Sequence, residues 1–164
     1  LLKAPAHLEH LKYLAAQYPG VSIVWAHRRP LEAVASFYSL VTNMRSGFSD
    51  NVDAHLAGQG ELQHSAVALE RGMEDRRRLS EDQFFDVSFS AICENPLSVV
   101  EDIYAHFGWE LSTDAQAGMQ AYLKQHPRFL YGKHDYSAET YGLSSASEEA
   151  YFGQYLQDYG AVLR

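Results

Sequence analysis

The sequence places two consecutive arginines directly after an apolar segment that has the composition of a buried strand. Residues 21–26 read VSIVWA, and His27, Arg28 and Arg29 follow them. Pro30 then stands where a first helical residue is expected. The N–H groups and the dipole at the start of a helix favour an anion, and a guanidinium matches the geometry of phosphate oxygens. The segment therefore predicts a turn that binds a phosphate group.

Ser36 is a second candidate for binding the same group. It follows Arg29 by two helical turns, a rise of roughly 10 Å along the axis, so the serine hydroxyl and a long arginine side chain can reach one ligand. The alternative interpretation is that Arg28 and Arg29 are surface residues of a solvated turn and that Ser36 is a small packing residue. The spacing by itself favours this alternative.

Hydrophobic periodicity predicts the elements that must position these residues. Two segments rich in β-branched and aromatic residues are strand candidates, residues 21–26 and 84–89. The spacing of apolar residues predicts helices over residues 6–18, 31–44, 62–79, 96–107, 113–125 and 146–159. Residues 46–60 and 126–137 are expected to form loops.

Strands separated by helices predict an α/β fold with parallel pairing and mostly helical content. In open sheets of this class, ligands bind beyond the carboxyl ends of the strands, which is where Arg28 falls. Such sheets normally contain several strands, and Leu1 to Pro5 resemble the end of a strand. We therefore expect residues 1–164 to form a single domain that lacks its N-terminal part.

The composition excludes several classes of protein. With 13 Lys and Arg against 21 Asp and Glu, the net charge is −8, which argues against broad binding to nucleic acid or to a membrane surface. No apolar run approaches the roughly 20 residues of a membrane span. The single cysteine, Cys93, suits a reducing, cytoplasmic location. His7 and His10 are three residues apart, but no pattern of carboxylates or cysteines completes a metal site.

Motifs along nearly the whole chain occur in the same order as in a known enzyme family. Residues 24–38 read VWAHRRPLEAVASFY and resemble the segment that binds the nucleotide 3′-phosphate in sulfotransferases that use PAPS, 3′-phosphoadenosine 5′-phosphosulfate. Residues 2–11, LKAPAHLEHL, resemble the opening motif of a bacterial subfamily of these enzymes. Residues 85–108 and 132–143 resemble two further stretches of that subfamily.

The resemblance implies a partial P-loop-like domain of three layers that transfers a sulfuryl group from PAPS, without a metal, to a hydroxyl or amine. The acceptor would be a small molecule, a glycan or a lipid. By the same resemblance, Arg28 and Ser36 hold the 3′-phosphate and Lys3 lies beside the reacting centre. His7 is the candidate general base, since a neutral imidazole accepts a proton near neutral pH. Lys133 would lie in a loop over the nucleotide, but it is equally explained as a solvated loop lysine.

The sequence also departs from the family pattern. Arg29 replaces an aspartate, so the pattern does not decide which arginine binds the phosphate, and Phe89 and Ser90 replace a common Tyr-Glu pair. Relatives with a Lys-Thr-His motif have their histidine two residues after the lysine, whereas His7 comes four after Lys3. No Gly-Thr-rich loop for the 5′-phosphosulfate is found. The alternative function is therefore a non-catalytic remnant that binds a nucleotide or a protein.

Overall fold

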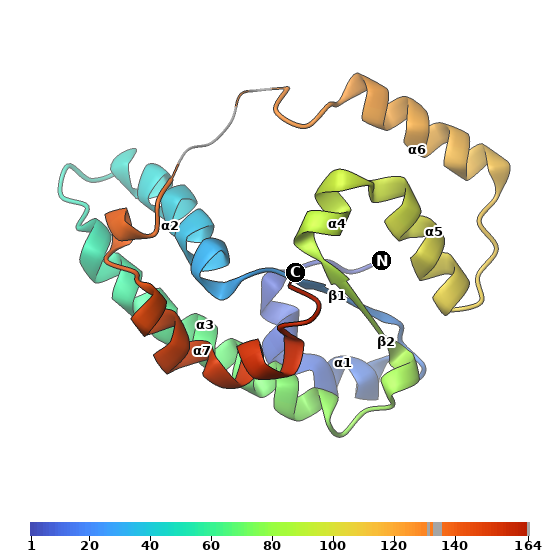
Figure 1. Ribbon diagram of the computed structural model, residues 1–164, viewed down its shortest axis with the longest axis horizontal. Helices are drawn as coiled ribbons and strands as arrows, with labels where there is room; N and C mark the ends of the chain where they lie inside the picture. Colours follow the sequence, from blue (N-terminus) through green and yellow to red (C-terminus); the bar gives the residue numbers. More distant parts are fainter. Residues whose placement is uncertain (131, 133–135, 164) are drawn as a thin grey trace.

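The computed structural model describes residues 1–130, 132 and 136–163, and for residues 54–59 it describes the backbone alone. Figure 1 shows helices arranged around a short sheet. The elements are, in chain order, η1 (Pro5–His10), α1 (Leu11–Gln17), β1 (Ile23–His27), α2 (Pro30–Ser46), α3 (Ala54–Arg76), η2 (Glu81–Gln83), β2 (Phe84–Ser88), α4 (Phe89–Glu94), α5 (Pro96–His106), α6 (Thr113–Gln125), η3 (Glu139–Tyr141) and α7 (Ser145–Tyr159).

The sheet of the described chain consists of β1 and β2, which run parallel. Trp25 pairs with Asp86, and His27 pairs with Ser88. The carboxyl ends of both strands therefore meet at one edge. This arrangement confirms the predicted α/β fold with a parallel sheet and mostly helical content.

Helices cover both faces of the sheet. Side chains alternate between the faces of a strand, and Trp25 packs on the first face in a core cluster with Leu11, Met73 and Tyr155 from α1, α3 and α7. On the second face, the ring of Phe85 lies 5.3 Å from that of His106 in α5. The sheet thus lies between two helical layers, as Figure 1 shows.

A second core cluster fixes α2, the helix that follows the basic turn. Val34 and Ala35 are buried against Leu62 of α3 and Phe152 of α7. The opposite side of α2 carries exposed residues such as Phe37. Because α2 packs on both α3 and α7, its N-terminal end has a defined position relative to β1.

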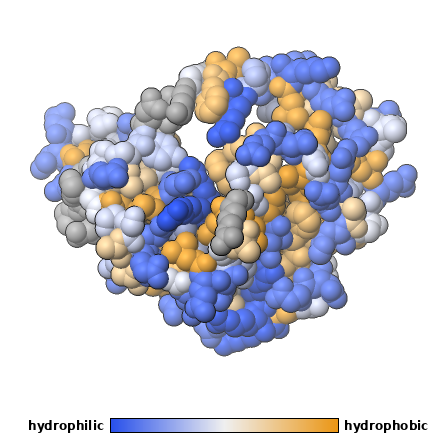
Figure 2. All heavy atoms as spheres, viewed as in Figure 1, coloured by the Kyte–Doolittle hydropathy of each residue, from blue (hydrophilic) through white to orange (hydrophobic). Residues whose placement is uncertain are grey.

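On the other side of the molecule, α6 lies apart from the main body and packs mainly on α5 (Figure 1). An apolar groove of about 450 Å³ separates these two helices and is lined by Leu97, Val100 and Met119 among others. Figure 2 shows hydrophobic residues over this region. None of the helices in the described ranges is long and apolar enough to cross a membrane.

Three sequence predictions are wrong in detail. The loop expected over residues 46–60 ends early, because α3 already begins at Ala54. Each of the two glycines in this segment costs about 1 kcal/mol of helix stability. The length and packing of α3 outweigh this cost. The helix expected over residues 6–18 begins as the 3-10 helix η1. Residues 1–4 form no strand, since the described sheet pairs only β1 with β2.

Candidate functional site

The basic turn lies at the carboxyl edge of the sheet. β1 ends at His27 and α2 begins at Pro30, so Arg28 and Arg29 alone connect strand and helix. Pro30 is the first helical residue, as predicted, because its fixed φ suits that position and it has no N–H that would need a partner. In Figure 2 the surface is hollowed between the region of α2 and the region of α4 and α5.

Arg28 is held by an aromatic side chain on each side. Its guanidinium donates a hydrogen bond of 2.7 Å to the hydroxyl of Tyr136 and lies 4.4 Å from the ring centre of Phe89. Its Nε lies 3.5 Å from a carboxylate oxygen of Glu32, one turn into α2. The Nε atom is buried, yet it makes no hydrogen bond with any described residue. The guanidinium therefore keeps an unused donor.

Arg29 has a different environment, because it binds a carboxylate of the protein itself. Its Nε and terminal nitrogen lie 3.1 Å and 3.0 Å from Oε2 of Glu148 in α7. The other oxygen of Glu148 accepts the N–H of Leu31, the second residue of α2, at 2.9 Å. The Glu148 side chain is only 2% exposed. It occupies the position at the start of α2 where the sequence predicted a ligand anion, which leaves Arg28 as the arginine available to a ligand.

Ser36 lies further along α2 and is half-buried. It follows Glu32 by four residues, so the two lie on one face of α2, and Glu32 contacts the Nε of Arg28. Its hydroxyl makes no hydrogen bond to another described residue. Glu32 thus neighbours both Arg28 and Ser36.

The remaining predicted site residues are placed elsewhere or not described. Lys3 is exposed in the N-terminal segment, and His7 is half-buried in η1, which packs on α3. Neither side chain makes a hydrogen bond or ion pair within the described ranges. Lys133 lies outside the described residues. No group of three or more described His, Cys, Asp or Glu residues could hold a metal ion.

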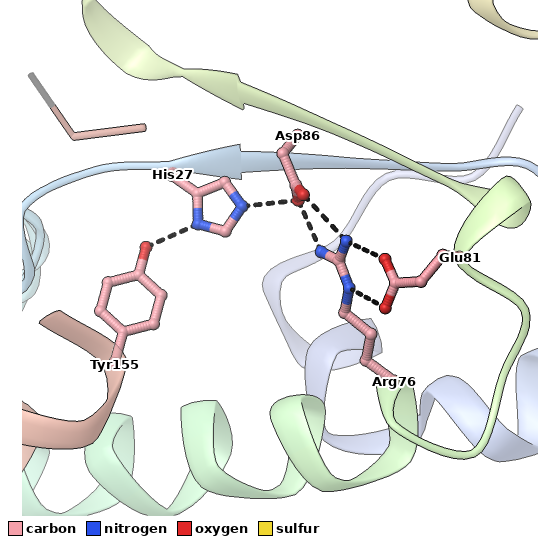
Figure 3. A network of polar contacts seen from close by, with 5 residues as sticks. All are labelled: His27, Arg76, Glu81, Asp86 and Tyr155. Atoms are coloured by element: carbon pink, nitrogen blue, oxygen red, sulfur yellow. Dashed lines mark hydrogen bonds and ion pairs between the residues drawn. The ribbon is translucent and has the colours of Figure 1, made fainter. Parts of the chain in front are cut away.

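A buried polar network lies beneath the basic turn and was not predicted from the sequence (Figure 3). The Nδ1 of His27 lies 2.8 Å from the hydroxyl of Tyr155, and its Nε2 lies 2.8 Å from a carboxylate oxygen of Asp86. Arg76 donates to both oxygens of Asp86, at 2.6 Å and 2.8 Å. It also pairs with Glu81 at 2.7 Å. The network connects β1, β2, α3 and α7.

The charges of this network follow from its contacts. Burial alone would raise the pKa of Asp86, but hydrogen bonds from His27 and Arg76 outweigh burial and lower this pKa to about 2. Burial also raises the pKa of the Tyr155 phenol, which therefore stays protonated. The ionised Asp86 can only accept, so the Nε2–H of His27 donates to it, and the Nδ1 atom accepts a hydrogen bond from the Tyr155 hydroxyl. With His27 only 1% exposed, this network is structural rather than catalytic.

Comparisons with known proteins identify the family. A sequence profile described as "Sulfotransferase family" matches residues 1–114. The chain belongs to this family. A comparison with curated proteins found no match.

Two solved sulfotransferases have the same arrangement of elements. Sulfotransferase STF9 from Mycobacterium avium is 25% identical, with a TM-score of 0.85 over 96% of this chain. Sulfotransferase STF1 from Mycobacterium tuberculosis H37Rv is 31% identical, with a TM-score of 0.78 over 93% of this chain. The chain spans 41% and 39% of the lengths of those two proteins.

The residues that the sequence did not reveal are Glu148 and the partners of His27. No sequence pattern indicates that Glu148 binds the start of α2, since Leu31 lies 117 positions earlier in the chain. His27 is 1% exposed, so it is a packed histidine at the end of β1. The sequence signal for this network was a histidine at the end of one strand and an aspartate in the middle of the next, which can meet when the two strands pair.

Proposed function

We propose that this chain binds PAPS through Arg28 and Ser36 and takes part in sulfuryl transfer to a hydroxyl or amine. The observation that carries the proposal is the contrast between the two arginines of the turn. Arg29 is bound to a buried carboxylate, whereas Arg28 keeps a buried Nε without a hydrogen-bond partner among the described residues. A guanidinium with an N–H that makes no hydrogen bond to a described residue suits a phosphate oxygen.

The surroundings of Arg28 also fit a nucleotide phosphate. The rings of Phe89 and Tyr136 restrict the guanidinium, so less conformational entropy is lost when a ligand binds. Ser36 supplies a neutral hydroxyl donor on the same side of α2. A doubly charged 3′-phosphate would be held by one cation and one hydroxyl, which favours PAPS over donors without that phosphate.

The reaction itself follows from the chemistry of the donor. The acceptor oxygen or nitrogen forms a bond to sulfur while the bond from sulfur to the bridging phosphate oxygen breaks, as in in-line phosphoryl transfer. In this proposal the Lys3 ammonium stabilises the charge that develops on the bridging oxygen. His7 takes the acceptor proton as general base. Lys133 is proposed to cover the nucleotide, and small molecules, glycans and lipids are the proposed acceptors.

A cytoplasmic location is part of the same proposal. PAPS must be present where the chain acts, and the single cysteine, half-buried Cys93, requires no oxidising compartment.

Calorimetric titration with adenosine 3′,5′-bisphosphate tests the binding assignment. We expect Arg28→Ala to weaken binding by about 10- to 100-fold, because a charge-assisted hydrogen bond contributes about 1.5–3 kcal/mol. Arg78→Ala is the matched control, since Arg78 pairs only with Glu74 on its own helix among the described residues. Equal affinity of wild type and Arg28→Ala, or a preference for adenosine 5′-phosphate, would contradict the assignment.

A second candidate function is nucleotide binding without sulfuryl transfer. It is worth testing because the chain spans 41% and 39% of the two solved sulfotransferases. Incubation of the chain with sulfur-labelled PAPS and a panel of phenols, sugars and amines distinguishes the two. Labelled acceptor that depends on Arg28 supports transfer. Tight binding of the bisphosphate without labelled product supports a binding module.

A further inference from the structure

The C-terminal helix α7 contacts the residues on both sides of Arg28. Tyr155 binds the imidazole of His27 at 2.8 Å, and Glu148 binds Arg29 at 3.0 Å. The two α7 residues are seven positions apart, which is two helical turns, so they lie on one face of the helix. This face is directed at the turn between β1 and α2.

These contacts are among the most buried polar contacts of the chain. Tyr155 is 4% exposed, and His27 and Glu148 are each 1% exposed. A polar group that loses its partner at such a depth keeps the cost of its burial without the compensating hydrogen bond. The backbone of His27 and Arg29 is therefore held firmly, while the side chain of Arg28 between them points to a different set of neighbours.

The helix α7 also changes the charge around the turn between β1 and α2. The Glu148 carboxylate contacts two nitrogens of Arg29 and accepts a hydrogen bond from the N–H of Leu31, so both the neighbouring cation and the start of α2 are already neutralised. Without Glu148, Arg29 and the helix start would attract phosphate groups at a second position. With it, Arg28 is the cation of the turn that a ligand meets.

We propose that Glu148 and Tyr155 of α7 are positioning residues that fix Arg28 and make it the selective contact of the nucleotide 3′-phosphate. This inference rests on the proposed function and goes beyond it, because that function assigns no role to either residue. α7 acts through His27 and Arg29. The preference for a 3′-phosphorylated nucleotide is thus set partly by a helix more than 100 positions away in the chain, as the separation of 119 between Arg29 and Glu148 shows.

The test compares two ligands that differ only in the 3′-phosphate. Adenosine 3′,5′-bisphosphate and adenosine 5′-phosphate are titrated against the full chain and its Glu148→Gln and Tyr155→Phe variants. We expect each variant to lose about fivefold to tenfold in its affinity for the bisphosphate, since a small misplacement of a charged donor costs on the order of 1 kcal/mol. Affinity for the 5′-phosphate should stay within about twofold, because the 3′-phosphate contact is the one disturbed.

Controls separate positioning from general destabilisation. Gln157→Ala changes an exposed residue of α7 and should leave both affinities unchanged. A purely structural role would lower the binding of both ligands in proportion and would leave their ratio unchanged. A variant that keeps the wild-type ratio, or that prefers the bisphosphate more strongly because Arg29 is free, overturns the inference.

The outcome also distinguishes this inference from the proposed function. If the wild type itself does not prefer the bisphosphate, the proposed function fails. If the wild type prefers it and both variants keep that preference, only the role of α7 fails. Should Glu148→Gln not fold, Tyr155→Phe, which removes a single hydroxyl, decides the question. Failure of both variants to fold contradicts a positioning role.

Discussion

Arg28 and Arg29 are neighbours in sequence but contribute to different properties of the protein. Arg28 faces Tyr136, Phe89 and the exposed Glu32. Arg29 is itself largely exposed, but its partner Glu148 is buried. The cost of losing an ion pair depends on the partner left behind, and only Arg29 leaves a buried carboxylate.

At this scale we expect Arg29→Ala to lower the free energy of unfolding by about 1–3 kcal/mol, because Glu148 would keep the Leu31 N–H as its one described partner. Arg28→Ala should change stability by less than about 1 kcal/mol, since its partner Glu32 is 60% exposed and is solvated when the ion pair is lost. Urea denaturation of both variants measures the difference. An equal loss in the two would contradict the division of roles between these arginines.

Ser36→Ala tests the second proposed phosphate contact. A neutral hydrogen bond contributes about 0.5–1.5 kcal/mol, so affinity for adenosine 3′,5′-bisphosphate should fall by roughly threefold to tenfold. Ser98→Ala, at a half-buried position in α5, is the matched control and should bind as the wild type does. Binding that is the same in both variants would remove Ser36 from the site.

At the scale of elements, one glycine permits the N-terminal segment to pack on the long helix α3. A Cβ added to Gly72 would lie 2.9 Å from Cγ and 3.0 Å from the carbonyl oxygen of Leu8 in η1. The carbonyl belongs to the backbone, so it cannot be relieved by a change of rotamer. The position of η1, which carries His7, therefore depends on a residue without a side chain at position 72.

We expect Gly72→Ala to lower the free energy of unfolding by about 1–3 kcal/mol, the usual cost of overpacking. Gly118→Ala in α6 is the opposite control. An added Cβ there meets nothing within 4 Å, and alanine is favoured over glycine in a helix by about 1 kcal/mol. Thermal or urea denaturation should therefore shift in opposite directions for the two variants. A stabilised Gly72→Ala would show that η1 does not pack there as described.

At the scale of the whole molecule, the network of Figure 3 connects elements from the start, the middle and the end of the chain. Asp86 is its centre, since it accepts from both His27 and Arg76. Arg76 also lies 4.4 Å from the ring centre of Phe84. The ionised carboxylate of Asp86 thus connects the sheet to α3 and, through His27, to α7. Its protonation should therefore lower the stability of the fold in acid.

The pKa of Asp86 is about 2 in the folded chain, below its ordinary value of 3.8. A lowered folded pKa stabilises the protein above the unfolded value, and this stabilisation is lost as the pH falls from about 4 to 2. The shift corresponds to about 2 kcal/mol. We expect Asp86→Asn to be less stable than wild type at pH 7 by about that amount, with the difference shrinking through this window.

Urea denaturation at a series of pH values measures the effect. Asp102→Asn is the control, because Asp102 is exposed on α5 and makes no ion pair with a described residue. A stability difference between wild type and Asp86→Asn that stays constant from pH 7 to pH 2 would mean that Asp86 is not held ionised by its neighbours.

The local features of this protein could be predicted from its sequence. The parallel α/β arrangement, the exact bounds of α6 and the proline at the start of α2 follow from periodicity and from the backbone preferences of single residues. The assignment of Arg28 and Ser36 to one site could be proposed from the sequence, because both belong to one strand–turn–helix segment, and it stays a prediction. The early start of α3 was missed, since length and packing override the composition of a short segment.

Only the tertiary structure decided which arginine is available and what fixes it. Glu148 and Tyr155 reach the turn across 119 and 128 positions of the chain. No periodicity or spacing encodes such a pair, because contacts between distant residues depend on how the helices pack on the sheet. Arg28 and Arg29 are the same residue type, but only Arg29 is bound by the buried carboxylate of Glu148. Arg28 is therefore the arginine that is available to a ligand.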